Sequence, residues 1–144
     1  MNPQLLSLCK RIRSNIIAST TAAGSGHPSS CISAVELTAV LFFNEFFKQD
    51  ISDFQNPLND KFILSKGHAA PLLYSLYEVA GVLSHEEMLT LRKFDSRLQG
   101  HPTPQVPFVD VTTGSLGQGL SVGVGMALGL KLKAKSLKLK FKTT

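Results

Sequence analysis

The chain has 144 residues, of which 43% are hydrophobic and 17% charged, and this length and mixture predict one globular domain that can bury a core. Its formal net charge of +5 arises at the C-terminal end, because residues 1–130 hold nine Lys or Arg and ten Asp or Glu, and six lysines follow. A nearly neutral body gives no electrostatic argument for nucleic acid, and no apolar stretch has the length of a membrane span. We therefore expect neither nucleic acid nor membrane as a partner.

The sequence predicts a cytoplasmic protein. Its N-terminus shows no basic stretch followed by an apolar run, so it gives no sign of a secretory signal. Cys9 and Cys31 follow no metal-binding or CxxC spacing, and each lies in an apolar segment. We expect both to be buried free thiols, which suits a reducing compartment.

The first third of the chain predicts two helices joined by a loop. Apolar residues recur at helical spacing from about 3 to 22, and the glycine at position 24 ends that pattern. The loop that follows reads GSGHPSS (24–30), and its two serines are candidate helix caps. The sequence SAVE (33–36) has the spacing of a capping box and opens an apolar helix to Phe47.

The rest of the chain alternates short apolar segments with helices. KFIL (61–64) and FVDVTT (108–113) are short and β-prone, and each runs into a loop that contains glycine. Helices are expected over 69–80, over 84–94 from an SHEE capping box, and after the glycine-rich loop to about 133. This order predicts an α/β fold, with a parallel sheet flanked by helices and ligand loops at the carboxyl ends of the strands.

Three of the four histidines follow a glycine directly: His27 in SGHPSS, His68 in SKGHAA and His101 in QGHPTP. A glycine before the histidine and Pro or Ala after it favour a tight turn from which the imidazole projects. Such rings can bind phosphate or sugar oxygens and can move protons near neutral pH. Zinc is the less favoured alternative, because zinc ligands are often close in sequence and these lie 33 to 41 residues apart. We therefore predict no metal ligand, and we expect the fourth histidine, His85, to belong to a helix start.

The loop TTGSLGQG (112–119) follows the second expected strand. Glycines at such a junction let backbone N–H groups approach an anion or a flat ring, and a helix N-terminus adds partial positive charge. No lysine follows, so the loop is not a P-loop. We interpret residues 114–117 as ligand-contacting and the later glycines, 119 and 123, as one smooth packing face with Ala127.

In their order and separation, SGHPSS, SKGHA, GHPTP and TTGSLGQGLS closely resemble the N-terminal part of the transketolases. The resemblance covers about residues 3–132 and implies a partial thiamine diphosphate-binding fold. Transketolases use thiamine diphosphate and Mg²⁺ to transfer two-carbon ketol units between sugar phosphates. A 1-deoxyxylulose-5-phosphate synthase is a related but poorer match, because its loop after the first helix is expected to differ from SGHPSS.

The resemblance implies a role for each matching residue. His27 would be catalytic, contacting the sugar substrate and the reacting end of the cofactor. His101 would also be catalytic and would hydrogen-bond the hydroxyls of the donor and of the covalent intermediate. His68 would approach the diphosphate of the cofactor. The other cofactor-binding positions that the resemblance implies are Gly114, Ser115 and Leu116.

The sequence departs from the transketolase pattern after the glycine-rich helix. In the family, a strand ending in a GDG-type motif follows, and its Asp and a later Asn bind the Mg²⁺. Here the last acidic residue is Asp110, so we identify no Mg²⁺ ligand, and no second domain supplies the glutamate that acts on the cofactor. We therefore expect residues 1–132 to be a truncated transketolase N-terminal domain and residues 133–144 to be a basic tail that is disordered or frayed.

These observations lead to one functional hypothesis and two alternatives. The chain is expected to be transketolase-like and to act on sugar phosphates, with activity only in a homodimer or with a complementary transketolase C-terminal chain. The first alternative is a non-catalytic remnant of the fold or an interaction protein. The second is an unrelated module whose basic tail binds nucleic acid or an anionic membrane.

Overall fold

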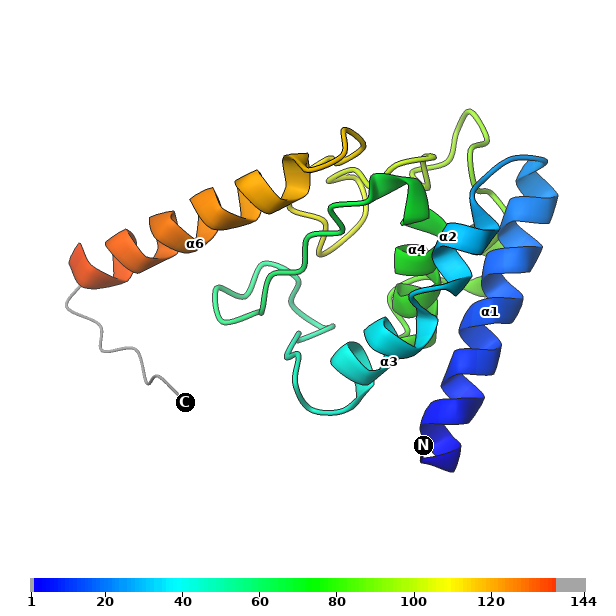
Figure 1. Ribbon diagram of the computed structural model, residues 1–144, viewed down its shortest axis with the longest axis horizontal. Helices are drawn as coiled ribbons and strands as arrows, with labels where there is room; N and C mark the ends of the chain where they lie inside the picture. Colours follow the sequence, from blue (N-terminus) through cyan, green and yellow to red (C-terminus); the bar gives the residue numbers. More distant parts are fainter. Residues whose placement is uncertain (1, 137–144) are drawn as a thin grey trace.

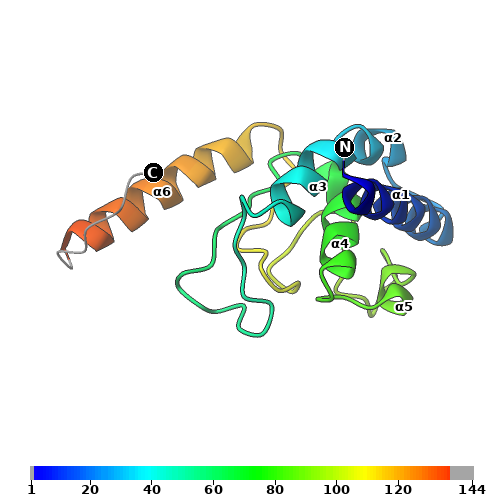
Figure 2. The same cartoon turned by 90° about the horizontal axis from the view of Figure 1, so that it is seen from below.

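The computed structural model describes residues 2–136 and shows a helical body from which the C-terminal helix projects (Figure 1). The elements in chain order are α1 (Pro3–Ala23), α2 (Pro28–Ile32), α3 (Val35–Phe43), the 3-10 turn η1 (Gly67–Ala69), α4 (Ala70–Val79), α5 (His85–Met88) and α6 (Gln118–Ser136). Irregular segments connect α3 to η1 and α5 to α6, and Figure 2 shows the first of them looping below α3.

The expected parallel sheet is wrong, because the described residues contain helices and no strand. The two segments expected to be strands, 61–64 and 108–113, do meet: Thr113 Oγ1 donates a hydrogen bond to the Leu64 carbonyl at 2.7 Å. No backbone hydrogen bond joins these two segments. Since strands exist through backbone hydrogen bonds to a neighbouring strand, β-prone residues alone do not make a sheet here.

Helix α1 confirms the first predicted helix. The Asn2 side chain caps its start by accepting a hydrogen bond from the Gln4 backbone N–H at 2.9 Å. Gly24 ends the helix in the left-handed region, with φ = 59°, and its N–H bonds back to the carbonyl groups of the last turn. Glycine adopts this conformation without the steric cost that a side chain brings, so the expected end of the helix is correct.

The predicted capping box at SAVE does not form. The Ser33 hydroxyl donates to the Ser30 carbonyl at 2.9 Å and caps no helix. The two candidate capping serines, 29 and 30, lie inside the short helix α2, which begins at Pro28. Helix α3 then ends at Phe43, four residues before the expected end, so the apolar run continues beyond the helix.

The later helices have other bounds than expected. Ser84 caps α5 as predicted, accepting from the Glu87 N–H at 3.1 Å, but α5 is only four residues long. Helix α6 continues past the expected domain boundary at 132 and ends at Ser136. The rest of the expected tail, 137–144, lies outside the described residues. No helix in the described part of the chain is long and apolar enough to cross a bilayer.

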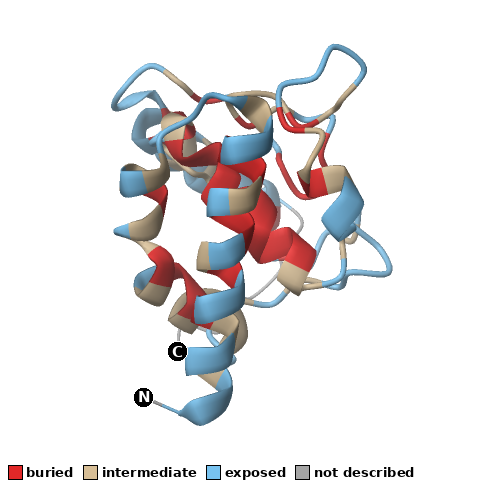
Figure 3. Cartoon of the chain, turned by 90° about the vertical axis from the view of Figure 1, so that its right-hand side faces the viewer, coloured by how far each residue is buried: buried red, intermediate tan, exposed pale blue. Residues whose placement is uncertain are grey.

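Helix α4 is the centre of the fold, and every residue from 70 to 78 is buried (Figure 3). Helices α1, α3 and α5 all pack on it. One apolar cluster lies between α4, α5 and the loop that precedes α6, and a second lies between α4 and helices α1 to α3. Cys9 and Cys31 belong to the second cluster as buried free thiols, which confirms that prediction.

One buried carboxylate joins α1 to α4. Glu78 Oε1 accepts from Arg11 at 2.5 Å and Glu78 Oε2 accepts from the Asn15 amide at 2.6 Å. The Glu78 side chain is 3% exposed, whereas that of Arg11 is 58% exposed. The hydrogen bond to Glu78 raises the pKa of Arg11. Arg11 and Asn15, both on α1, therefore satisfy the buried Glu78 carboxylate on α4.

We expect Glu78→Ala to lower the free energy of unfolding by about 1–3 kcal/mol, because it leaves the buried Asn15 amide without its acceptor. Arg13→Ala is the matched control. It removes the half-exposed ion pair between Arg13 and Glu36 and is expected to cost less than about 1 kcal/mol. Urea unfolding followed by circular dichroism measures both, and equal losses in the two variants would contradict this assignment.

Candidate functional site

The structure brings the three glycine-preceded histidines together. The ring centroids of His27 and His68 lie 5.2 Å apart, and those of His68 and His101 lie 5.0 Å apart. Both pairs meet edge to face, with interplanar angles of 84° and 78°. His85 is the first residue of α5, as expected, and makes no such contact with the other three in the described structure. The three loops, far apart in sequence, thus form one site with His68 touching both partners.

Glycine at position 67 allows the His68 loop to approach the glycine-rich loop. A methyl group at Gly67 would lie 2.6 Å from the Thr113 carbonyl carbon and 2.9 Å from the Gly114 nitrogen. Both are backbone atoms that cannot move aside easily. The side chain of Thr113 completes the link through its hydrogen bond to Leu64. The glycine before the histidine therefore serves close packing between two backbones.

The lack of a side chain at Gly114 also allows close packing, here with the His101 ring. A methyl group at Gly114 would lie 3.2 Å from His101 Cδ2, tighter than ordinary van der Waals contact. The absence of a side chain lets the imidazole rest on the backbone of the loop. Ser115 and Leu116 follow on the exposed surface, and 75% of Leu116 is accessible. The structure therefore puts Gly114 against His101 and leaves Ser115 and Leu116 exposed.

Tyr74 joins the His101 loop to helix α4 through its hydroxyl group. Its hydroxyl lies 3.0 Å from the Gln99 carbonyl oxygen and 3.2 Å from the His101 carbonyl oxygen, and it can donate to either. The ring is fully buried in α4, and burial raises the pKa of Tyr74. Because this hydroxyl stays protonated, it remains a hydrogen-bond donor. It holds the His101 loop by backbone carbonyl groups and does not use the His101 imidazole.

The electrostatics of the site favour a neutral ring at His101. Burial lowers the pKa of His101, and the neighbouring His68, Arg92 and His27 lower it further. A neutral imidazole offers one donor and one acceptor, whereas the protonated ring offers two donors. His101 can therefore accept a proton or a hydrogen bond at neutral pH.

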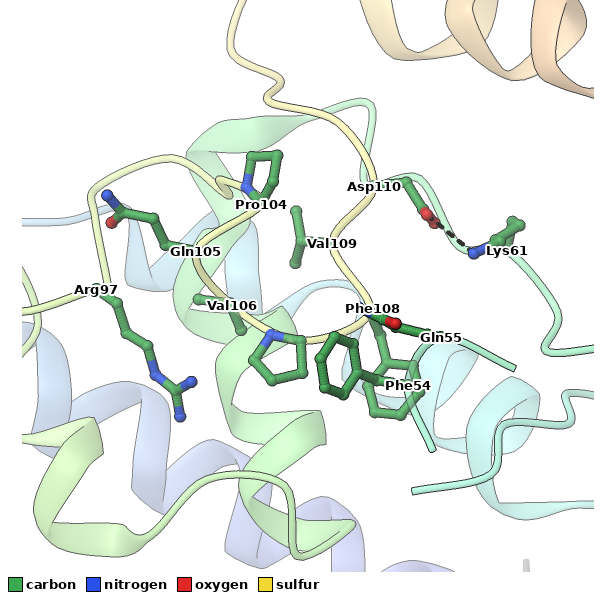
Figure 4. A pocket seen from close by; sticks show the side chains of 11 residues that line it. Phe54, Gln55, Lys61, Arg97, Pro104, Gln105, Val106, Phe108, Val109 and Asp110 are labelled. Carbon is green, nitrogen blue, oxygen red and sulfur yellow. Dashed lines mark hydrogen bonds and ion pairs between the residues drawn. The ribbon is translucent and has the colours of Figure 1, made fainter. Parts of the chain in front are cut away.

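A separate cavity of about 640 Å³ lies on the outer side of the 104–110 loop (Figure 4). Its wall mixes apolar with polar and charged side chains, and the rings of Phe54 and Phe108 meet edge to face with centroids 6.4 Å apart. The two cations that line it already have carboxylate partners. Lys61 lies 2.9 Å from Asp110, and Arg97 pairs with Glu87. None of the predicted site residues lines this cavity, so it is distinct from the histidine site.

The comparison with known families decides how this site is to be understood. A family model described as "Transketolase, thiamine diphosphate binding domain" matches residues 6–141. The chain belongs to the transketolase family. All four transketolase-like motifs of the sequence lie inside the matched region.

Individual transketolases align over most of this chain. The transketolase of Pongo abelii is 55% identical over 118 residues, which cover 82% of this chain and 19% of that protein. Transketolase 1 of Saccharomyces cerevisiae is 40% identical over 111 residues, which cover 76% of this chain and 16% of that protein. The chain thus spans about a fifth of the length of these relatives.

Solved transketolase structures follow the same chain path. The enzyme from Campylobacter jejuni superposes with a TM-score of 0.84 at 31% identity, over 93% of this chain and 21% of that chain. The enzyme from Pichia stipitis in complex with sedoheptulose-7-phosphate gives a TM-score of 0.80 at 35% identity, over 85% of this chain and 18% of that chain. The overall path is therefore shared although the described residues of this chain form no strand.

Two features of the site fit thiamine diphosphate. His68 Nδ1 is buried and has no hydrogen-bond partner in the described structure, so it can meet a ligand's polar atom. The second feature is the glycine-rich loop, in which Gly114 lies against the His101 ring and close to Gly67, the residue before His68. Among the described residues, no group of three or more His, Cys, Asp or Glu side chains could hold a metal ion. We assign no metal ligand.

Sequence reasoning missed two residues that shape the site. Tyr74 and Thr113 hold the loops through hydrogen bonds to the backbone of Gln99, His101 and Leu64. Each of these bonds joins residues at least 25 positions apart. No local pattern marks such contacts. The only signal was indirect, since Thr113 directly precedes the glycine-rich loop.

We expect Tyr74→Phe to lower the free energy of unfolding by about 1–2 kcal/mol and to move the NMR signals of the His101 ring, because the loop loses its donor. Tyr77→Phe is the control on the same helix. The Tyr77 hydroxyl is buried without a partner in the described structure, so its removal should be neutral or stabilising. A larger loss from Tyr77→Phe than from Tyr74→Phe would contradict the role given to Tyr74.

The lowered pKa of His101 also predicts a pH dependence. The unfolded chain binds a proton at His101 near the usual pKa of 6.5, and the native chain binds it only at lower pH. The contribution to stability is therefore complete above about pH 6.5 and is lost as pH falls through the native pKa. Urea midpoints at several pH values should show this loss, and His101→Gln should reduce it. An unchanged pH dependence in His101→Gln would contradict the prediction.

Proposed function

We propose that this chain supplies the thiamine diphosphate-binding part of a transketolase that transfers two-carbon ketol units between sugar phosphates. The observation that carries the proposal is the convergence of His27, His68 and His101, with Gly114 against the His101 ring. These are four of the six positions that the transketolase resemblance assigns to cofactor and substrate. Membership of the family supports it. The binding of sedoheptulose-7-phosphate by the Pichia stipitis relative supports sugar phosphates as the substrate class.

In this proposal, His68 and the glycine-rich loop hold the cofactor. His68 Nδ1 would donate to or accept from a polar atom of the ligand, depending on its tautomer, and would gain the partner that it lacks. The backbone at Gly114 and Ser115 would approach the ligand closely, and Leu116 would cover it with an apolar side chain. When bound, thiamine diphosphate supplies the carbon nucleophile and the electron sink. The Mg²⁺ that transketolases use would need ligands other than the described residues.

His27 and His101 would act on the sugar. His27 is exposed and touches His68, so it can contact a substrate that arrives from solvent. His101 is half-buried and its pKa is lowered, so its neutral ring can accept a hydrogen bond from a hydroxyl group and can take up a proton. Their common contact with His68 would place the sugar next to the cofactor.

Completion of the site would come from a second chain, either another copy of this one or a complementary transketolase C-terminal chain. Membership of the transketolase family supports this part of the proposal. The buried free thiols Cys9 and Cys31 support a reducing cytoplasm as the location.

Thiamine diphosphate binding can be tested on this chain alone. In a titration of the histidine-labelled protein, we expect the NMR signals of His68, His101 and His27 to move and the His85 signal to stay. Gly114→Val is expected to abolish the change, because its side chain would displace the His101 ring. The matched control Gly125→Val puts the same side chain where the structure leaves open space. Equal movement of all four signals, or of none, would contradict the cofactor assignment.

Catalysis can be tested by complementation. Co-expression of this chain with the part of the Pongo abelii transketolase that follows the aligned region should give ketol transfer between sugar phosphates. We expect His27→Ala and His101→Ala each to lower the rate by roughly 100-fold or more, since general acid–base groups contribute about this factor. His85→Ala should leave the rate unchanged. A complemented enzyme that is inactive, or that ignores the loss of His101, would contradict the proposal.

A further inference from the structure

Arg92 begins a tight loop that ends just before the His101 motif. Its backbone adopts the left-handed region with φ = 64°, which is uncommon for a residue other than glycine. Its N–H donates to the Leu98 carbonyl at 2.8 Å and closes the loop between them. This conformation fixes the direction in which the Arg92 side chain leaves the backbone.

The side chain of Arg92 reaches both outer histidine loops. Nη1 donates to the Ser25 hydroxyl, two residues before His27. The guanidinium also lies against Gly100, the residue directly before His101, where a methyl group would come within 2.7 Å of Cζ. One side chain thus contacts the neighbours of two proposed catalytic residues.

We propose that Arg92 is a positioning residue that joins the His27 loop to the His101 loop and sets the relative placement of the two imidazoles. The inference rests on the proposed function, because that function gives the two histidines their common task. No other side-chain hydrogen bond joins these two loops within residues 2–136. The glycine before His101 lets the guanidinium lie against its backbone, and a methyl group there would displace the Arg92 side chain.

The charge of Arg92 adds an electrostatic effect to the mechanical one. The groups near His101 that can carry positive charge are His68 from η1, His27 from the loop before α2, and Arg92. Arginine stays protonated in proteins, so it opposes a second positive charge at His101 at every relevant pH. Arg92 therefore helps to keep His101 neutral and able to accept a hydroxyl hydrogen bond.

The test uses histidine-labelled chain and follows each imidazole signal against pH. In Arg92→Met we expect the pKa of His101 to rise by roughly half a pH unit, because a nearby cation is lost. Arg92→Lys keeps the charge and should keep most of the lowered pKa, but it should move the His27 signals because it replaces the planar donor. Arg97→Met is the matched control, since Arg97 pairs with Glu87 and should leave both histidines unchanged.

Ser25→Ala tests the link from its other end without altering any charge. We expect the His27 signals to move as they do in Arg92→Met, while the pKa of His101 stays near its wild-type value. The proposal is overturned if Arg92→Met leaves the His101 titration unchanged, if Arg97→Met has the same effect, or if Ser25→Ala leaves the His27 signals in place. Failure of thiamine diphosphate binding would overturn the proposed function and leave these titrations unaffected, so the two failures are distinguishable.

Discussion

The burial of helix α4 from residue 70 to residue 78 is the constraint on which the rest of this structure depends. A helix with no exposed face needs apolar partners on every side, and α1, α3 and α5 supply them. Its one buried carboxylate, Glu78, is satisfied from α1. Because η1 leads directly into α4, the same burial fixes the position of His68. The Tyr74 hydroxyl extends this control to the His101 loop.

The site is therefore built by loops that rest on a helical body. The His27 loop leaves α1 at Gly24, the His68 loop enters α4, and the His101 loop bonds to α4 through Tyr74. The glycine-rich loop is held by Gly67 and Thr113. These contacts order four chain segments without a sheet in the described residues. The site that was expected at the ends of strands is therefore present although the described residues form no strand.

Most of helix α6, in contrast to α4, is not buried. Its first turn packs closely, because Gly119 lies against Ser65 and a methyl group there would clash with the Ser65 backbone. This confirms the packing role predicted for that glycine, and Gly123 continues it toward Ile63. Beyond these contacts the helix projects from the body (Figure 1), and its large apolar side chains are exposed. The exposed apolar residues of α6 are Leu120, Val124, Leu128, Leu130 and Leu132.

The sequence by itself determined the local features of this protein. The spacing of apolar residues predicted α1 and α4, the glycine at position 24 predicted the end of α1, and the four motifs indicated the transketolase family. Only the tertiary structure decided whether 61–64 and 108–113 pair as strands, because pairing needs a backbone partner that no single segment encodes. It likewise decided which residues hold the histidines together. Those bonds join distant segments, and their geometry follows from the packing around α4.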